Sequence, residues 1–293
     1  MRHLFKSVLA LTALLVLGGQ TPALGPQGAE GEPNREQQWL VPTPVADRPA
    51  HAMLFRPPGK GPFRLALIAH ATTQNVLRRA QMPQPKYRAL AGYLVTRGFA
   101  VLVPERLGHG ATGGDYLEDQ GGCDEADYAR SGRATADEIR KALDYMRSQP
   151  FVRRDGAVIV GHSAGGWGAL ALAGEDAKSI AAIVAFAPGR GGHANDFENR
   201  ICAPYTLLAA AKAFGKDARV PVTWLVAAND TYFSLAFSRK LADAFRSGGG
   251  KADFRALPAF GSEGHWLPET GSGVKLAAGD LDRALKPQAA KKR

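Results

Sequence analysis

The chain has 293 residues, of which 45% are hydrophobic and 22% are charged. This composition is typical of globular proteins and excludes a mainly disordered chain, and the length allows one large α/β domain or two small ones. The formal net charge is +10 at pH 7, but the basic residues are spread along the chain and form a run only at 291–293. The charge therefore does not favour a nucleic-acid partner over a basic but otherwise ordinary exported protein.

The first residues have the pattern of a secretory signal. Arg2, His3 and Lys6 precede the apolar run Val8–Leu17, and small residues follow up to Gly25. This pattern predicts a signal peptide over residues 1–25, with a retained N-terminal anchor as the alternative. The apolar run is shorter than the roughly 20 residues of a membrane-spanning helix. We therefore expect a periplasmic or secreted protein without stable membrane insertion.

The rest of the chain predicts alternating strands and helices. Continuous apolar runs predict strands over residues 51–55, 64–69, 99–103, 157–160, 180–186, 220–226 and 254–257. Helical spacing predicts helices over residues 86–97, 134–147, 166–173, 205–214, 235–245 and 274–285. Thr135 and Glu138 match a capping box at the start of the second helix. Such alternation predicts a mostly parallel sheet with helices on both faces.

Composition also marks the limits of the folded domain. Residues 26–40 are rich in Gly, Glu, Pro and Gln and predict a flexible linker, with regular structure beginning near Trp39. We expect one domain over residues 41–286 and a basic tail over residues 287–293.

The only two cysteines are Cys123 and Cys202, both in predicted loops. In an oxidising compartment an isolated pair is a disulfide candidate, with two separate thiols as the alternative. The pair lacks histidines at ligand spacing, so it predicts no zinc site.

The pentapeptide Gly161–Gly165, with sequence Gly-His-Ser-Ala-Gly, follows a predicted buried strand and precedes a helix of small residues. Strand, sharp turn and helix are the context in which this pattern forms a nucleophile elbow, with Ser163 at its tip. Glycines at both ends allow the close approach of strand and helix that the turn needs. We expect Ser163 to be a catalytic nucleophile.

A serine nucleophile needs a base, and the base needs an acid that orients it. His193 and His265 are the only histidines after Ser163. His265 follows the last predicted strand, where the base belongs, whereas His193 lies in an irregular segment. Asp230 directly follows the strand 220–226 and is the candidate acid, with a turn or helix-capping role as its alternative.

Other acidic residues fit the role of acid less well. Asp217 precedes its strand, Asp243 lies inside a helix and Asp253 begins a strand, so none of them follows the carboxyl end of a parallel strand.

The oxyanion of an acyl-transfer intermediate needs two hydrogen-bond donors. The backbone N–H of Ala164 is one candidate because it follows the nucleophile. The other should come from the loop after the strand 64–69, where we choose Thr72 and keep Ala71 as an alternative. His70 is expected to shape this loop, and His162 to support the site from beside Ser163.

At this point the chain resembles the α/β-hydrolase superfamily. Within it, the chain is similar to exported esterases related to dienelactone hydrolases and to prolyl oligopeptidases, over roughly residues 50–286. The elbow, the His70 loop, the segment 106–110, Asp230 and His265 occur in the order of that superfamily. Two residues depart from it. The oxyanion loop has His-Ala where His-Gly is common, and the nucleophile is Ser163 where dienelactone hydrolases proper use cysteine.

The resemblance implies the α/β-hydrolase fold, with a small cap inserted at about residues 189–219. Its apolar residues would form an acyl or alcohol pocket: Phe197, Ile201, Tyr205, Leu207 and Leu208. A plain surface loop is the alternative.

These observations predict a serine hydrolase that cleaves carboxylic esters through an acyl-enzyme on Ser163. The substrate would be a small-molecule or polymeric ester, and the reaction needs no cofactor or metal. A peptidase or amidase and an acyltransferase are alternatives on the same three residues. A non-catalytic binding protein is the alternative of a different class.

Overall fold

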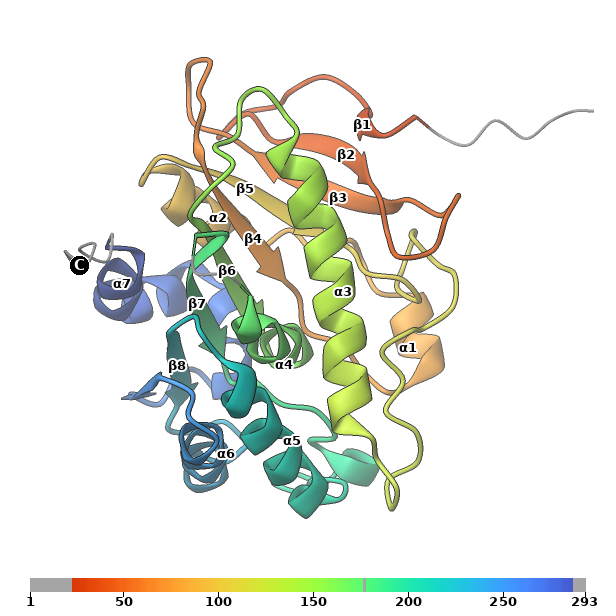
Figure 1. Cartoon of the computed structure of the whole chain (residues 1–293), viewed down its shortest axis with the longest axis vertical. Helices are drawn as coiled ribbons and strands as arrows, with labels where there is room; N and C mark the ends of the chain where they lie inside the picture. The colour runs from red at the N-terminus through yellow and green to blue at the C-terminus, as the bar shows by residue number, and fades with distance from the viewer. Residues whose placement is uncertain (1–22, 176–177, 287–293) are drawn as a thin grey trace, which may run out of the picture.

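The computed structural model describes residues 23–175 and 178–286, so most of the predicted signal peptide and the predicted basic tail 287–293 lie outside the described residues. The described part forms a nine-stranded sheet with helices on both faces (Figure 1). Its strands are β1 Gly25–Pro26, β2 Gln37–Val41, β3 Ala50–Phe55, β4 Arg64–Ala69, β5 Phe99–Pro104, β6 Ala157–His162, β7 Ile180–Phe186, β8 Val222–Ala227 and β9 Ala252–Leu257.

From β4 onward, at least one helix lies between successive strands along the chain. The α-helices are α1 Val76–Ala80, α2 Arg88–Val95, α3 Tyr128–Arg147, α4 Ala164–Ala171, α5 Pro204–Asp217, α6 Leu235–Ser247 and α7 Gly271–Leu285. The described residues also contain the short 3₁₀ helices η1 Leu172–Gly174, η2 Ala194–Asp196 and η3 Gly264–Glu269. Among the described residues, no helix has both the length and the apolar character to cross a membrane.

The sheet is parallel from β5 to β9 and antiparallel at its first strands. Its strand order is β1-β2-β3-β5-β4-β6-β7-β8-β9, with β1, β2 and β3 joined by antiparallel pairs and β3 antiparallel to β5. The strands β5, β4, β6, β7, β8 and β9 run parallel to their neighbours, so their carboxyl ends meet at one edge. This is the α/β-hydrolase arrangement expected from the sequence.

Side chains that alternate along each strand divide the core into two layers. Leu65, Leu67 and Ala69 of β4 face one layer, which α3, α4, α5 and α6 cover. Ala66 and Ile68 face the other, which α2 and α7 cover. Figure 1 shows α3 and α4 in front of the sheet and α7 on its far side. Because both faces are covered, the central strands need the continuous apolar runs that the sequence displays.

The prediction of a flexible linker over residues 26–40 is wrong. Pro26 belongs to β1 and residues 37–40 to β2, which pairs with β3 in register from Gln37 to Val41. Gln37 is buried and its Oε1 accepts a hydrogen bond from the indole N–H of Trp39 at 2.9 Å. The polar composition did not indicate a strand, because β2 is stabilised by its pairing with β3 and not by the strand propensity of its own residues.

Helix α3 begins at Tyr128, six residues before the predicted start, and the predicted capping box is wrong. The side chain of Asp127 caps the helix by accepting the N–H of Arg130 at 2.9 Å. Thr135 and Glu138 are buried inside the helix. The first turns of α3 were missed because Gly132 has a low helix propensity. Glycine is needed there because a Cβ would lie 2.7 Å from the ring of Phe214 in α5.

The predicted cap over residues 189–219 is smaller than expected. Its second half is α5, whose residues Leu207, Ala211 and Phe214 are buried in the core against the sheet. Parallel neighbours such as β7 and β8 need a crossover connection, and a helix packed on the sheet usually provides it. Only residues 189–203 remain to border the active-site region described below.

A disulfide joins Cys123 and Cys202, as predicted. The bond connects the loop before α3 to the segment before α5, and 79 positions separate the two cysteines in the sequence. It therefore fixes two walls of one cavity, because both cysteines line the same pocket.

Replacing both cysteines by serine is expected to lower the free energy of unfolding by about 4 kcal/mol, because the bond restricts a long loop in the unfolded chain. Denaturant unfolding followed by tryptophan fluorescence measures this change. Reduction of the wild-type protein should give the same loss, and reduction of the double variant should change nothing. Identical midpoints for oxidised and reduced wild type would contradict the prediction.

Candidate active site

Ser163 occupies the sharp turn between β6 and α4. Its backbone has φ 53° and ψ −118°, a conformation that is strained for a residue with a side chain. Two backbone hydrogen bonds hold it, from the N–H of Ser163 to the carbonyl of Phe186 at 2.9 Å and from the N–H of Trp167 to the carbonyl of Ser163 at 2.8 Å. The strained turn is the backbone geometry of a nucleophile elbow.

The glycines of the elbow allow backbones to approach closely. A Cβ at Gly165 would lie 2.1 Å from the carbonyl oxygen of Ala69, and one at Gly161 would lie 2.5 Å from the Cα of Gly166. Side chains at these positions would therefore push α4 away from β6 and from the end of β4. The contact at Ala69 brings the first turn of α4 beside the loop where we placed the second oxyanion donor.

His265 and Asp230 form a buried hydrogen-bonded pair. Nδ1 of His265 lies 2.9 Å from Oδ2 of Asp230, and both side chains are almost fully buried. Oδ1 of Asp230 accepts the backbone N–H groups of Tyr232 at 2.9 Å and Phe233 at 2.8 Å. Because the carboxylate accepts the Nδ1 proton, Nε2 of His265 is left with the lone pair that a general base needs.

One cavity of about 680 Å³ brings most of the predicted residues together. Ser163, Ala164, His265 and Thr72 all line it, and Asp230 lies behind His265. Its further lining includes the disulfide and the segment 189–196. The structure thus gathers at one sheet edge residues that the sequence separates by up to about two hundred positions.

The loop expected to carry the second oxyanion donor, residues 70–73, is held by two buried imidazoles. Nε2 of His70 accepts the N–H of Arg106 at 3.1 Å, so its proton is on Nδ1, which donates to the carbonyl of Ala71 at 2.6 Å. The rings of His70 and His109 meet edge to face with centroids 4.8 Å apart. Burial lowers the pKa of both histidines, that of His109 to about 4, so both rings are neutral at neutral pH.

Hydrogen bonding within this loop discriminates between the two candidate donors. The N–H of Ala71 donates to the hydroxyl of Tyr87 at 3.2 Å and is already satisfied. Nδ1 of His109 contacts the carbonyls of Arg106 and Leu107, both at 3.0 Å, so its Nε2 accepts the hydroxyl of Thr72 at 2.5 Å. The side chain of Thr72 is thus fixed, and this arrangement favours its backbone N–H over that of Ala71.

Comparison with protein families gives an identification. Residues 84–262 match the dienelactone hydrolase family, which is more than half of the chain. The chain belongs to the dienelactone hydrolase family. Family membership supports a hydrolase, and the matched range contains Ser163 and Asp230 and ends just before His265.

Solved structures similar to this dienelactone hydrolase family member share its fold at low sequence identity. An acylaminoacyl peptidase of Pyrococcus horikoshii matches with a TM-score of 0.60 and 14% identity, over 88% of this chain and 43% of the peptidase, so this chain spans less than half of that protein. A cold-adapted esterase from an Arctic intertidal metagenomic library matches with a TM-score of 0.55 and 17% identity, over 88% and 98% of the two chains. An esterase of Pyrococcus furiosus matches with a TM-score of 0.58 and 12% identity, over 90% and 100%. Comparison with curated proteins finds no significant match.

Sequence reasoning missed the aromatic stack beside the histidine of this family member. The ring of Tyr232 is stacked on His265 with centroids 4.2 Å apart, and the ring of His193 is stacked on Tyr232 at 3.6 Å. Nε2 of His193 contacts the hydroxyl of Thr231 at 2.9 Å. The position of Tyr232, two residues after Asp230, could have indicated its place beside the site. Nothing in the sequence indicates that His193 stacks on Tyr232, because only the fold brings the two together.

Two further side chains hold the loop that carries His265. Oε1 of Glu263 accepts the backbone N–H groups of His265 at 2.9 Å and Thr231 at 3.1 Å, and so joins the loops of the base and the acid. Nε2 of His162 lies 2.8 Å from the carbonyl oxygen of His265 and donates to it. His162 therefore has the supporting position expected from the sequence, whereas Glu263 was missed although it lies two positions before His265.

The apolar residues expected to form a pocket in the cap do not do so. Leu207 is buried in the core, while Tyr205 is 83% exposed and Phe197 is 58% exposed. The segment 189–196 and Cys202 form this wall of the active-site cavity instead. Because α5 belongs to the helical layer, its apolar face is directed to the sheet and away from the cavity.

Proposed function

We propose that the protein is a serine hydrolase that cleaves carboxylic esters through an acyl-enzyme on Ser163. The observation that carries this proposal is the pairing of His265 with Asp230 in the cavity that holds Ser163 at a strained turn. A histidine whose Nδ1 donates to a buried carboxylate has its Nε2 available to take a proton from a hydroxyl.

In the proposed reaction Oγ of Ser163 attacks the ester carbonyl while Nε2 of His265 takes its proton. Asp230 stabilises the imidazolium, and the face of Tyr232 stacked on the ring adds to this stabilisation. The N–H groups of Ala164 and Thr72 bind the oxyanion, and Ala164 begins α4, whose N-terminus favours negative charge. His265 then protonates the leaving alcohol and activates the water that releases the acid.

Replacing Ser163 by alanine tests this proposal. The turnover of a p-nitrophenyl ester should fall by at least about 10⁴-fold, and covalent labelling by a fluorophosphonate probe should disappear. Ser262→Ala is the matched control, because Ser262 is exposed in the loop before His265. Its turnover and labelling should match the wild type, and undiminished labelling of the Ser163→Ala variant would refute the proposal.

A peptidase acting on the same residues is the second candidate, favoured by the fold shared with the acylaminoacyl peptidase. A panel that pairs p-nitrophenyl esters with the corresponding anilides separates the two activities. Faster turnover of the anilides by the wild type would favour the peptidase.

We also propose that the protein works in the periplasm or after secretion. Its disulfide supports such a location, because disulfides persist in oxidising compartments. Expression with residues 1–25 fused to a reporter that needs export tests the signal, with residues 26–50 as the control fusion.

A further inference from the structure

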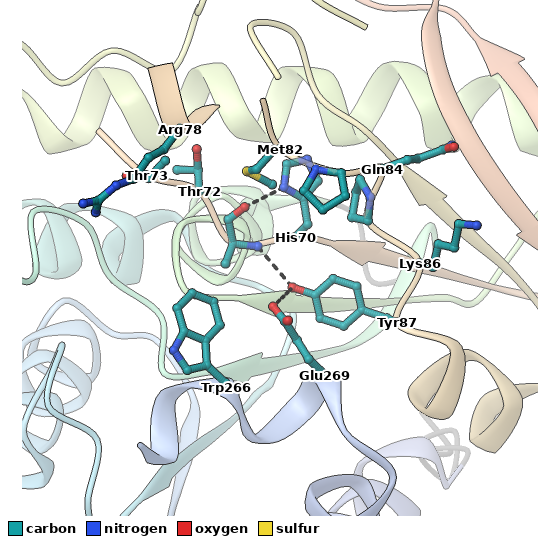
Figure 2. A pocket seen from close by; sticks show the side chains of 13 residues that line it. His70, Thr72, Thr73, Arg78, Met82, Gln84, Lys86, Tyr87, Trp266 and Glu269 are labelled. Carbon is teal, nitrogen blue, oxygen red and sulfur yellow. Dashed lines mark hydrogen bonds between the residues drawn. The ribbon is translucent and has the colours of Figure 1, made fainter. Parts of the chain in front are cut away.

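A second cavity, of about 390 Å³, lies beside the active-site cavity (Figure 2). Its walls are the oxyanion loop 70–73, the segment 82–87 and two residues of η3, Trp266 and Glu269. Both cavities are lined by Thr72 and Trp266, so they meet beside the oxyanion donor. A substrate bound at Ser163 can therefore extend past Thr72 into this second cavity.

Glu269 places a carboxylate in this cavity with no basic partner. Its Oε1 lies 3.3 Å from the hydroxyl oxygen of Tyr87 and 3.5 Å from Nδ1 of His162, and within residues 23–175 and 178–286 no Lys or Arg pairs with it. The hydroxyl of Tyr87 donates instead to Nδ1 of His162 at 2.8 Å. Burial lowers the pKa of His162, so that ring is neutral and does not balance the carboxylate.

The two basic residues that line the cavity have acidic partners outside it. Nζ of Lys86 lies 3.8 Å from Oε1 of Glu36, and Nη1 of Arg78 lies 3.6 Å from Oδ1 of Asp196. In Figure 2 they lie at opposite sides of the group drawn, away from Glu269. Of the residues that the structure describes, Glu269 is the only carboxylate that lines the cavity, and both lining cations have a carboxylate partner outside it.

Aromatic rings flank this carboxylate. Figure 2 shows Trp266 on one side of Glu269 and Tyr87 on the other. Trp266 is 38% exposed, so its ring is accessible from the cavity. Cations bind favourably over the faces of Trp and Tyr, and a nearby carboxylate adds a direct charge attraction. Carboxylate and aromatic rings together form a site that suits an ammonium group better than a neutral or anionic one.

We propose that this cavity is a subsite for a positively charged group of the substrate, a primary or quaternary ammonium, bound by Glu269 and the rings of Trp266 and Tyr87. The inference rests on the proposed ester hydrolysis and names a substrate class for it. Met82, Pro83 and Pro85 supply apolar surface for the chain that links the cation to the ester.

Matched esters that differ only in charge test the subsite. One pair is acetylthiocholine and its isostere with a quaternary carbon in place of nitrogen, which puts the charge on the leaving group. The other pair is the p-nitrophenyl ester of trimethylammoniobutyrate and its carbon isostere, which puts the charge on the acyl group. In at least one pair the wild type should have a kcat/KM about tenfold higher for the charged ester, an advantage that falls as salt rises.

Glu269→Gln keeps the side-chain shape but removes the charge. It should abolish the preference for the charged ester while leaving turnover of the neutral isostere nearly unchanged. Asp115→Asn is the matched control, because Asp115 is exposed and lines neither cavity, so it removes one negative charge away from the site. An equal loss of kcat/KM for the charged and the neutral ester would assign Glu269 a positioning role through His162. A preference for the charged ester that survives in Glu269→Gln would exclude the subsite.

A binding measurement separates this inference from the proposed reaction. Benzyltrimethylammonium should quench tryptophan fluorescence saturably in the wild type, and about tenfold more weakly in Glu269→Gln. Trp266→Phe should lose most of the quenching. Neutral-ester turnover together with equal affinity in wild type and Glu269→Gln would overturn the subsite while leaving the proposed function intact. Specific cation binding without any ester turnover would support the subsite and contradict the proposed function.

Discussion

Asp230→Asn is expected to lower kcat for ester hydrolysis by about 10⁴-fold with little change in KM. The amide of asparagine can donate to Nδ1 of His265, which moves the imidazole proton to Nε2 and removes the base. The substitution keeps the shape of the side chain and an acceptor for the N–H groups of Tyr232 and Phe233, so the fold should persist. Steady-state kinetics on a p-nitrophenyl ester, with circular dichroism to check folding, measure the effect.

Asp243→Asn is the matched control for this substitution. Asp243 is an exposed residue of α6 whose carboxylate pairs with Arg246 at 2.8 Å on the surface. Exposed pairs of this kind contribute little, so kcat should stay within about twofold of the wild type. A kcat for Asp230→Asn within tenfold of the wild type would remove Asp230 from the proposed mechanism.

Features that depend on a short stretch of adjacent residues were predicted well. The strand β5 was predicted because buried parallel strands need an unbroken apolar run, and Phe99–Val103 provides one. The elbow was recognised because its glycines, its serine and its flanking strand are adjacent in the chain. The order of Asp230 and His265 along the chain, combined with the alternation of elements, was enough to place both at one edge of the sheet.

Features that depend on segments meeting in space were not predicted. Tyr87 and Glu269 are 182 positions apart, and neither neighbourhood carries a pattern that indicates their contact. The same holds for His193, which reaches Tyr232 only through the path of the chain after β7. The strand β2 was missed for a related reason, since its pairing with β3 supplies the stability that its polar sequence does not indicate.

A buried charge cluster beside the proposed oxyanion loop, residues 70–73, is the clearest case of such long-range assembly. Glu118 forms ion pairs with both Arg106 and Arg190, and all three side chains are almost fully buried. Burial alone would raise the pKa of Glu118, but the two arginines outweigh it and hold this pKa well below its usual value near 4.5. The cluster joins the loop after β5 to the segment after β7, and therefore fixes two sides of the active-site region.

Glu118→Gln is expected to lower the free energy of unfolding at pH 7 by about 3–5 kcal/mol, because it leaves two buried guanidinium groups without a counter-charge. Guanidinium chloride unfolding measures the loss. The folded pKa of Glu118 lies below its unfolded pKa, so the stability that the carboxylate contributes is present above the unfolded value and is lost as pH falls toward the folded one. The difference between wild type and variant should accordingly shrink in acid.

Glu138→Gln is the matched control, because Glu138 is buried in the same region and its Oε2 accepts the N–H of Leu107 at 2.8 Å. Burial, and next the neighbouring Glu118, raise the pKa of Glu138 to about 8, so its carboxyl is already neutral at pH 7. An amide replaces a neutral carboxyl with little change in charge, and the expected loss is below about 1 kcal/mol. Equal destabilisation by the two substitutions would mean that packing of the side chains, and not the charge of Glu118, holds the arginines. A selective loss in Glu118→Gln would instead establish that one buried carboxylate holds the loop after β5 in place. This loop supports the proposed oxyanion site, since the N–H of Arg106 donates to His70.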